Sequence, residues 1–164
     1  MIETLGLPIS PAEYLRQRSL LLEKSFLSAA AIPGARSFVE GLAARGVPIA
    51  VATSSDRHMF TVKTRNHEWF SNFSVVVCGD DGIARYKPEP DIFLAAAERL
   101  GYEPEDCLVF EDSVAGLRAA LNARMRVIAF PDPRHDPAQF AGATRLAEDF
   151  RELLPSVFSM FQRS

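Results

Sequence analysis

The sequence lacks the features that identify secreted disulfide-rich proteins, membrane proteins and nucleic-acid-binding proteins. It contains only two cysteines, Cys78 and Cys107, both at or near apolar runs, so we expect free thiols in a reducing compartment and not a disulfide framework. No apolar run approaches the roughly 20 residues of a membrane helix, and the first ten residues lack the basic and apolar regions of a signal peptide. The net charge of −3 comes without a basic stripe, which disfavours nucleic-acid binding. These absences predict a cytoplasmic protein without a membrane or nucleic-acid partner.

Short apolar runs alternate with helical patterns along the chain. A hydrophobic fraction of 48% over 164 residues is enough for the core of one domain. Runs rich in β-branched residues predict buried strands at 47–53, 74–78, 107–110 and 125–130. Apolar residues at helical spacing predict helices at 10–28, 34–45, 57–70, 91–100, 114–122 and near 148–154. This alternation indicates a parallel sheet with helices on both faces, a three-layer Rossmann-like α/β fold.

Local signals predict where several helices begin and end. Ser10 can cap the first helix, Pro11 suits its first helical position, and Glu13 completes a capping box. Gly46 and Gly101 follow two of the predicted helices directly, where glycine readily adopts the left-handed conformation that ends a helix.

Polar side chains follow the predicted strands at the edge where parallel sheets bind ligands. Thr53 and Ser54 come after the first strand, Lys87 follows the loop after the second, and Glu111 and Asp112 come after the third. Hydroxyl groups and a lysine suit phosphate oxygens, and carboxylates suit Mg²⁺. The pattern indicates metal-assisted phosphoryl transfer.

Each of these segments also has a purely structural interpretation. Residues 53–56 could only cap the next helix, Lys87 could be solvated, and the acid pair 111–112 could favour the positive end of the following helix. The pair 80–81 is typical of a turn. No metal-ligand spacing joins the histidines, so we expect structural or surface roles for His58, His67 and His135.

Three segments resemble motifs of one known family. VATSS (51–55), KPEPDIF (87–93) and VFEDSVAGLRAA (109–120) are similar to the second, third and fourth motifs of the haloacid dehalogenase superfamily. The likeness is to its β-phosphoglucomutase-like phosphatases and, through VVVCGDD (75–81), to the pseudouridine-5′-phosphatase branch. It extends over about residues 5 to 155.

The resemblance implies a role for each polar residue at the strand ends. Thr53 would hydrogen-bond the transferring phosphoryl group with help from Ser54, and Lys87 would neutralise the phosphate and the nucleophile. Glu111 and Asp112 would hold Mg²⁺ directly or through water. Residues 1–31 would be the remnant of a helical cap over a small phosphorylated metabolite, such as a sugar or nucleoside phosphate, and residues 32–164 the α/β core.

The sequence departs from the family pattern at its most important motif. The family begins with a strand that ends in Asp-x-Asp-x-Thr, where the first aspartate becomes an aspartyl-phosphate, and the printed chain contains no Asp-x-Asp. In the family that strand lies between the strands predicted here at 47–53 and 107–110. Because neighbouring strands are about 4.8 Å apart, we expect a sheet that is incomplete at its first strand and exposes two unpaired edges.

Two hypotheses follow for the activity of this chain. It is a fragment or inactive form of a Mg²⁺-dependent phosphatase, because the aspartate nucleophile is missing, or it is a non-catalytic module derived from this fold. The second hypothesis includes completion of the sheet by a strand from another chain. A receiver-like phospho-acceptor domain is disfavoured, because Lys87 precedes Glu111 and Asp112 here.

Arg124 stands where the family usually has glycine. A left-handed turn at this position would cost arginine about 1 kcal/mol.

Overall fold

The computed structural model describes residues 8–153 and residue 157. Its α-helices are α1 (Pro11–Leu27), α2 (Ala35–Ala43), α3 (Arg57–Thr64), α4 (Asp91–Leu100) and α5 (Val114–Asn122). The strands are β1 (Ala50–Ala52), β2 (Val75–Val77), β3 (Leu108–Glu111), β4 (Arg126–Ala129) and β5 (Arg145–Leu146). Short 3₁₀ helices are η1 (Glu68–Asn72), η2 (Pro104–Asp106), η3 (Pro137–Phe140) and η4 (Phe150–Glu152). In this part of the chain no helix is long and apolar enough to cross a membrane.

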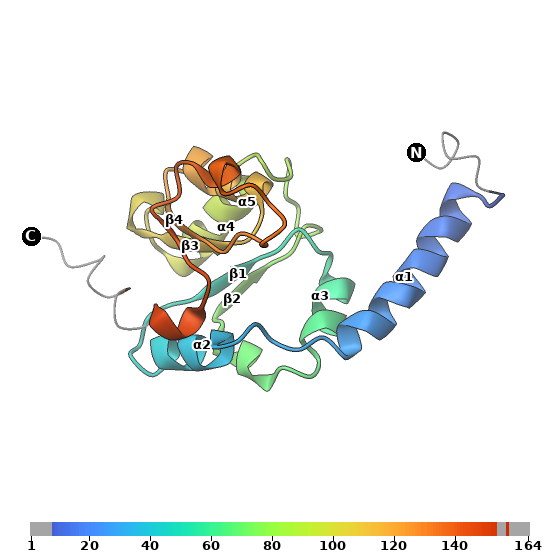
Figure 1. The fold of residues 1–164 in the computed structure, drawn as a ribbon, viewed down its shortest axis with the longest axis horizontal. Coiled ribbons are helices and arrows are strands. Elements are labelled where there is room, and N and C mark those ends of the chain that lie inside the picture. Colours follow the sequence, from blue (N-terminus) through green and yellow to red (C-terminus); the bar gives the residue numbers. More distant parts are fainter. Residues whose placement is uncertain (1–7, 154–156, 158–164) are drawn as a thin grey trace, which may run out of the picture.

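The described strands form two parallel sheets. One contains β1 and β2, and the other has the order β3-β4-β5; Figure 1 shows β1 beside β2 and β3 beside β4. The α/β fold with parallel strands and intervening helices, predicted from the sequence, is confirmed.

Two apolar clusters hold the layers together. Helices α4 and α5 pack on one side of the strands, where Phe93, Leu117 and Val127 are buried. Helix α2 and η4 lie on the other side, where Phe38 and Ile128 are buried (Figure 1). Alternate residues of β3 and β4 therefore belong to different clusters, as expected for a sheet covered on both faces.

A cavity of about 590 Å³ lies between the two sheets. Both β1 and β3 line it, together with apolar side chains of α2 and α4. The sequence predicts a gap between these two strands, and the cavity lies where that gap is expected.

Both cysteines are free thiols, as expected from the sequence. Cys78 is fully buried and Cys107 is half-buried. Burial is the largest cause of the raised pKa of each thiol, so neither is poised as a reactive thiolate.

The first helix begins as predicted but uses only half of the predicted capping box. The Ser10 hydroxyl accepts a hydrogen bond from the N–H of Glu13 at 3.2 Å. The Glu13 carboxylate does not return the bond to Ser10, because it binds Arg16 at 2.8 Å and Gln17 at 2.6 Å. These charged and amide donors hold the carboxylate within the first turns of the helix.

Most predicted elements are a few residues shorter in the structure, and the helix predicted at 57–70 and the strand predicted at 47–53 are shortened most. The helix predicted at 57–70 ends at Thr64, because side chains after it bind elsewhere: Asn66 donates to the carbonyl of Leu27 at 2.8 Å, and Trp69 stacks on Phe70 with ring centroids 4.3 Å apart. Strand β1 covers only three residues of the seven predicted at 47–53, since proline has no N–H for sheet pairing at position 48.

The C-terminal region differs most from the prediction. Strand β5 was not predicted, since both of its residues are exposed and it has no apolar run. In place of a helix near 148–154 the structure has the 3₁₀ helix η4, and residue 154 lies outside the described residues.

Arg124 adopts the left-handed conformation anticipated from the sequence, with φ of 61°. We therefore expect Arg124→Gly to raise the free energy of unfolding by about 1 kcal/mol, because glycine pays no Cβ penalty there. The ion pair lost with Glu105 is exposed and 3.8 Å long, so its removal costs little. Urea unfolding measures the difference, and a destabilised variant would show that the arginine is not strained.

Candidate functional site

The loop after β1 places the first candidate residues at the carboxyl end of the sheet. Thr53 is half-buried and Ser54 is exposed. The Thr53 hydroxyl accepts a hydrogen bond from the N–H of Ser55 at 3.1 Å, while the cap of α3 is Asp56, which accepts from the N–H of Met59 at 2.7 Å. Capping of the helix therefore does not account for Thr53, which braces the turn that presents Ser54.

Lys87 lies between the ends of β1 and β3. Its side chain is only 12% exposed and its ammonium group contacts the Glu111 carboxylate. The ammonium also lies 3.4 Å from the carbonyl oxygen of Ala52 and 4.6 Å from the centre of the Phe93 ring. Lys87 is thus a buried, paired cation and not a solvated loop residue.

Glu111 is the most heavily bonded carboxylate at this edge. Oε1 contacts Lys87, and Oε2 accepts from the N–H of Asp112, the N–H of Ser113 and the Ser113 hydroxyl at 2.9 to 3.0 Å. Burial opposes ionisation of Glu111, but the charge of Lys87 and these donors outweigh it, so the pKa is lowered. Glu111 is therefore ionised, and its contacts join the end of β3 and the start of α5 to Lys87.

Asp112 is the exposed member of the acid pair. Its pKa is raised, first by the partial desolvation of its carboxyl group and then by the neighbouring charge of Glu111. Among the described residues no group of three or more His, Cys, Asp or Glu side chains is arranged to hold a metal ion. The donors present at this edge are two adjacent carboxylates, which suits a Mg²⁺ ion that keeps most of its water.

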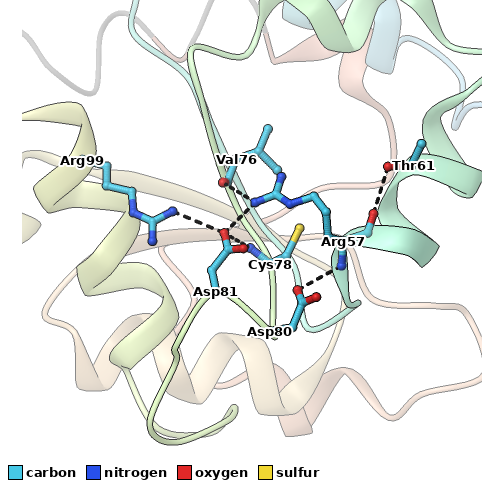
Figure 2. A network of polar contacts seen from close by, with 7 residues as sticks. All are labelled: Arg57, Thr61, Val76, Cys78, Asp80, Asp81 and Arg99. Atoms are coloured by element: carbon cyan, nitrogen blue, oxygen red, sulfur yellow. Dashed lines mark hydrogen bonds and ion pairs between the residues drawn. The ribbon is translucent and has the colours of Figure 1, made fainter.

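A polar network outside the predicted site fixes the loops after β1 and β2 (Figure 2). The Arg57 guanidinium donates to Asp81 at 2.6 Å and to the carbonyl of Val76 at 3.2 Å, and the main-chain N–H of Arg57 donates to the Asp80 carboxylate at 2.9 Å. Arg99 adds a second cation 3.3 Å from Asp81. The predicted turn residues 80–81 therefore also hold the start of α3, next to Ser54, against the end of β2.

Two glycines are close to the candidate residues. A Cβ on Gly116 would lie 2.0 Å from the carboxyl carbon of Glu111, and a Cβ on Gly79 would lie 2.8 Å from the carbonyl oxygen of Ser54. A side chain at position 116 would meet the Glu111 carboxylate, and one at position 79 would meet the main chain of Ser54, so glycine suits both positions.

Several residues that shape this site are not predicted from the sequence. No role is predicted from the sequence for Ser113, Gly116, Phe93 or Arg57. Ser113 caps α5 by accepting from the N–H of Gly116 at 3.0 Å, a pattern that its spacing could have predicted. The contacts of Arg57 with Asp80 and Asp81 join residues 23 and 24 positions apart, so no local signal predicts them.

The histidines take no part in this site. His58 lies 3.1 Å from Glu23, and His67 lies 3.1 Å from the carbonyl oxygen of Ala29. His135 packs edge-on against Phe140. These contacts fit the structural roles expected from the sequence.

Comparison with known proteins identifies relatives over most of the chain. The family model of haloacid dehalogenase-like hydrolases matches residues 11–124. The chain is 41% identical to a probable pseudouridine-5′-phosphatase of Drosophila melanogaster, over 98% of this chain and 71% of the relative. It is 40% identical to a bifunctional riboflavin kinase/FMN phosphatase of Arabidopsis thaliana, over 80% of this chain but only 35% of the relative.

A solved structure of similar fold is that of a putative beta-phosphoglucomutase from Thermotoga maritima. The two superpose with a TM-score of 0.82 at 27% identity, over 96% of this chain and 74% of the other. On the family model and the sequence relatives together, the chain belongs to the haloacid dehalogenase-like hydrolases, and its relatives include phosphatases of small phosphorylated metabolites.

Proposed function

We propose that this chain is the phosphate- and Mg²⁺-binding part of a phosphatase that acts on small phosphorylated metabolites, such as sugar or nucleoside phosphates. The observation that carries the proposal is the position of Lys87, whose ammonium lies between the end of β1 and the Glu111 carboxylate. A buried cation at the ligand-binding edge of a parallel sheet suits the phosphate of a monoester.

The residues around Lys87 have complementary roles. The hydroxyl of Thr53 and the exposed Ser54 would donate hydrogen bonds to phosphate oxygens. Lys87 would offset the charge of the phosphate, and Glu111 would hold Lys87 in place by the contact they share.

The two carboxylates at the end of β3 would hold Mg²⁺. Asp112, which is exposed, would bind the ion directly, and Glu111, whose oxygens already accept from Lys87 and Ser113, would act through water. A bound Mg²⁺ would offset the charge that develops on the phosphoryl oxygens. Because the pKa of Asp112 is raised, a nearby cation would stabilise the ionised form of its carboxylate.

Residues 1–31 remain our proposed cap remnant, and residues 32–164 the core. The contacts of α1 favour this division, because α1 packs chiefly on α3 and projects away from the sheets (Figure 1). Lys63 joins the two parts: its ammonium lies 4.6 Å from the ring centre of Phe26 and donates to the Ser55 hydroxyl at 2.8 Å. A cap held here would lie beside the loop that carries Ser54.

We further propose that this 164-residue chain does not turn over substrate. It has no Asp-x-Asp motif, and Thr53 or Lys87 could replace an aspartate nucleophile only through different chemistry. With p-nitrophenyl phosphate and Mg²⁺ we expect hydrolysis at the uncatalysed rate, unchanged by Asp112→Ala. Hydrolysis well above that rate, abolished in the variant, would overturn this part of the proposal.

The alternative function is a non-catalytic module that binds a partner. The observation that favours it is the apolar cavity between the two sheets, which is lined by 27 residues of several elements. Binding of phosphate that does not respond to Mg²⁺ would favour this alternative.

A further inference from the structure

A second cavity, of about 500 Å³, lies beside the link between α1 and α2 (residues 28–34), which Figure 1 shows running from one helix to the other. Its volume is within the range of sites for small molecules. None of the candidate phosphate-site residues lines it. This link cavity is lined by side chains of the link, of α2 and of residues 65–69, namely Ala31, Arg36, Arg65, Asn66, His67, Glu68 and Trp69.

Two side chains of the link cavity hold the link against the core. Asn66 donates to the carbonyl oxygen of Leu27 at 2.8 Å, and Nε2 of His67 lies 3.1 Å from the carbonyl oxygen of Ala29. A carbonyl oxygen only accepts, so Nε2 of His67 carries the hydrogen and Nδ1 of the neutral ring is an acceptor. These contacts fix two walls of the cavity before any ligand binds, which lowers the cost of binding.

The cations of the link cavity have donors to offer. Arg65 is exposed, and no hydrogen bond or ion pair joins its guanidinium to another residue in the described part of the chain. Arg36 donates through Nε to Glu40 at 2.8 Å. Because a guanidinium has five N–H donors, that single bond leaves the terminal amino groups of Arg36 for a ligand.

The charges around the link cavity favour a ligand with one negative charge. Arg36 and Arg65 are positive, but Glu40 offsets Arg36 and the exposed Glu68 carboxylate lines the cavity. A phosphate dianion would be repelled by Glu68. A single carboxylate suits Arg65 better, because it can accept two parallel hydrogen bonds from one guanidinium.

Trp69 gives the link cavity an aromatic wall. The residue is half-buried, and its indole packs on Phe70 with ring centroids 4.3 Å apart. A planar ring in the cavity can pack against this held indole. The ligand that matches the lining therefore combines an aromatic ring with one carboxylate.

We propose that the link cavity binds a small aromatic monocarboxylate, with its carboxylate on Arg65 and its ring against Trp69. Arg36 adds donors for the carboxylate, and Nδ1 of His67 accepts from an N–H or O–H group of the ligand. Such a ligand would strengthen the attachment of the link to the core. The inference does not rest on the proposed phosphatase function, because the two sites share no residue.

Calorimetric titration with indole-3-acetate tests the proposal. Its indole supplies the ring and an N–H, and its side chain supplies the carboxylate. Because Arg65 is exposed and water weakens the ion pair, we expect a dissociation constant just below about 1 mM. Indole-3-ethanol, which keeps the ring without the charge, should bind at least about tenfold more weakly. Equal binding of the two compounds, or no binding of the acid at 10 mM, would contradict the proposal.

A second titration, in 10 mM inorganic phosphate, separates the link cavity from the phosphate site. We expect the affinity for indole-3-acetate to be unchanged, and competition by phosphate would overturn the proposal. NMR then locates the ligand, with the largest shifts expected at the amides of Ala31, Arg65 and His67. Largest shifts at Lys87 would place the ligand at the phosphate site, and largest shifts at Ala50 would place it in the cavity between the sheets. Either result would overturn the assignment.

Variants of Arg65 provide the matched controls. Arg65→Gln should weaken binding of indole-3-acetate at least about tenfold, and Arg65→Lys, which keeps the charge but loses the planar fork, at least about threefold. Arg118→Gln makes the same charge change at an exposed arginine of α5 outside the cavity and should leave binding unchanged. If circular dichroism shows that Arg65→Gln does not fold, Arg36→Gln replaces it. Equal weakening by the cavity variant and by Arg118→Gln would show a general effect of charge and overturn the proposal.

Discussion

Replacing Lys87 by methionine should lower the free energy of unfolding by about 3 kcal/mol, one of the two largest effects that we expect. The side chains of Lys87 and Glu111 are only 12% and 8% exposed. Removing one partner of a buried ion pair leaves the other charge without compensation. Urea unfolding by circular dichroism measures the loss.

Two controls separate the buried pair from a general effect of charge. Arg85→Met removes ion pairs of 3.0 and 3.2 Å from a side chain that is 62% exposed, and should cost less than about 1 kcal/mol. Adding Glu111→Gln to Lys87→Met should recover part of the stability, since the uncompensated charge is then gone. A loss in Lys87→Met as small as that in Arg85→Met would mean that the pair does not anchor the site.

The same pair sets the acid sensitivity of the protein. The pKa of Glu111 is lowered from 4.5 in the folded state, so its ionised form contributes stability that is present above pH 4.5 and is lost as the pH falls through the lower folded value. Lys87→Met removes a cause of that shift. The variant should therefore lose less stability than the wild type between about pH 5 and pH 3.

Gly116→Ala should have an effect of similar size and lower the free energy of unfolding by about 2 kcal/mol. Alanine normally favours a helix over glycine, but here its Cβ would lie 2.0 Å from the Glu111 carboxyl carbon and 2.1 and 2.2 Å from the two oxygens. Glu111 cannot move aside without leaving Lys87 and Ser113, which leaves buried polar groups unsatisfied.

A double variant tests the cause of that loss. Glu111→Asp shortens the side chain by one methylene and withdraws the carboxylate from Gly116. The cost of Gly116→Ala should then fall to near zero, a positive coupling by double-mutant cycle. Additive losses would show that the alanine acts elsewhere in α5.

The sequence predicts the α/β order well where the signals are local. Helix α4 has the predicted bounds, because an apolar periodicity and Gly101 mark it without ambiguity. The end of α3 could not be predicted, because the contact of Asn66 with Leu27 joins residues 39 positions apart. Strand β5 has no signal of its own, and only its pairing with β4 makes it a strand.

In the candidate site, too, the sequence predicts what depends on local signals and not what depends on contacts between distant residues. The rule that ligands bind at the carboxyl ends of parallel strands placed Thr53, Lys87 and Asp112 at one edge. It could not show that Glu111 is committed to Lys87 and Ser113 while Asp112 stays exposed, since this depends on how β3 and α5 meet. Nor could it predict that Gly116 must be glycine.

Calorimetric titration with inorganic phosphate, with and without Mg²⁺, tests the central claim most directly. If Lys87, Thr53 and Asp112 form one site for phosphate and metal, Mg²⁺ should tighten phosphate binding at least about fivefold. Asp112→Asn should abolish this coupling, and Asp132→Asn, which changes an acid after β4, should preserve it. Equal phosphate affinity with and without Mg²⁺, or coupling that survives in Asp112→Asn, would contradict the account.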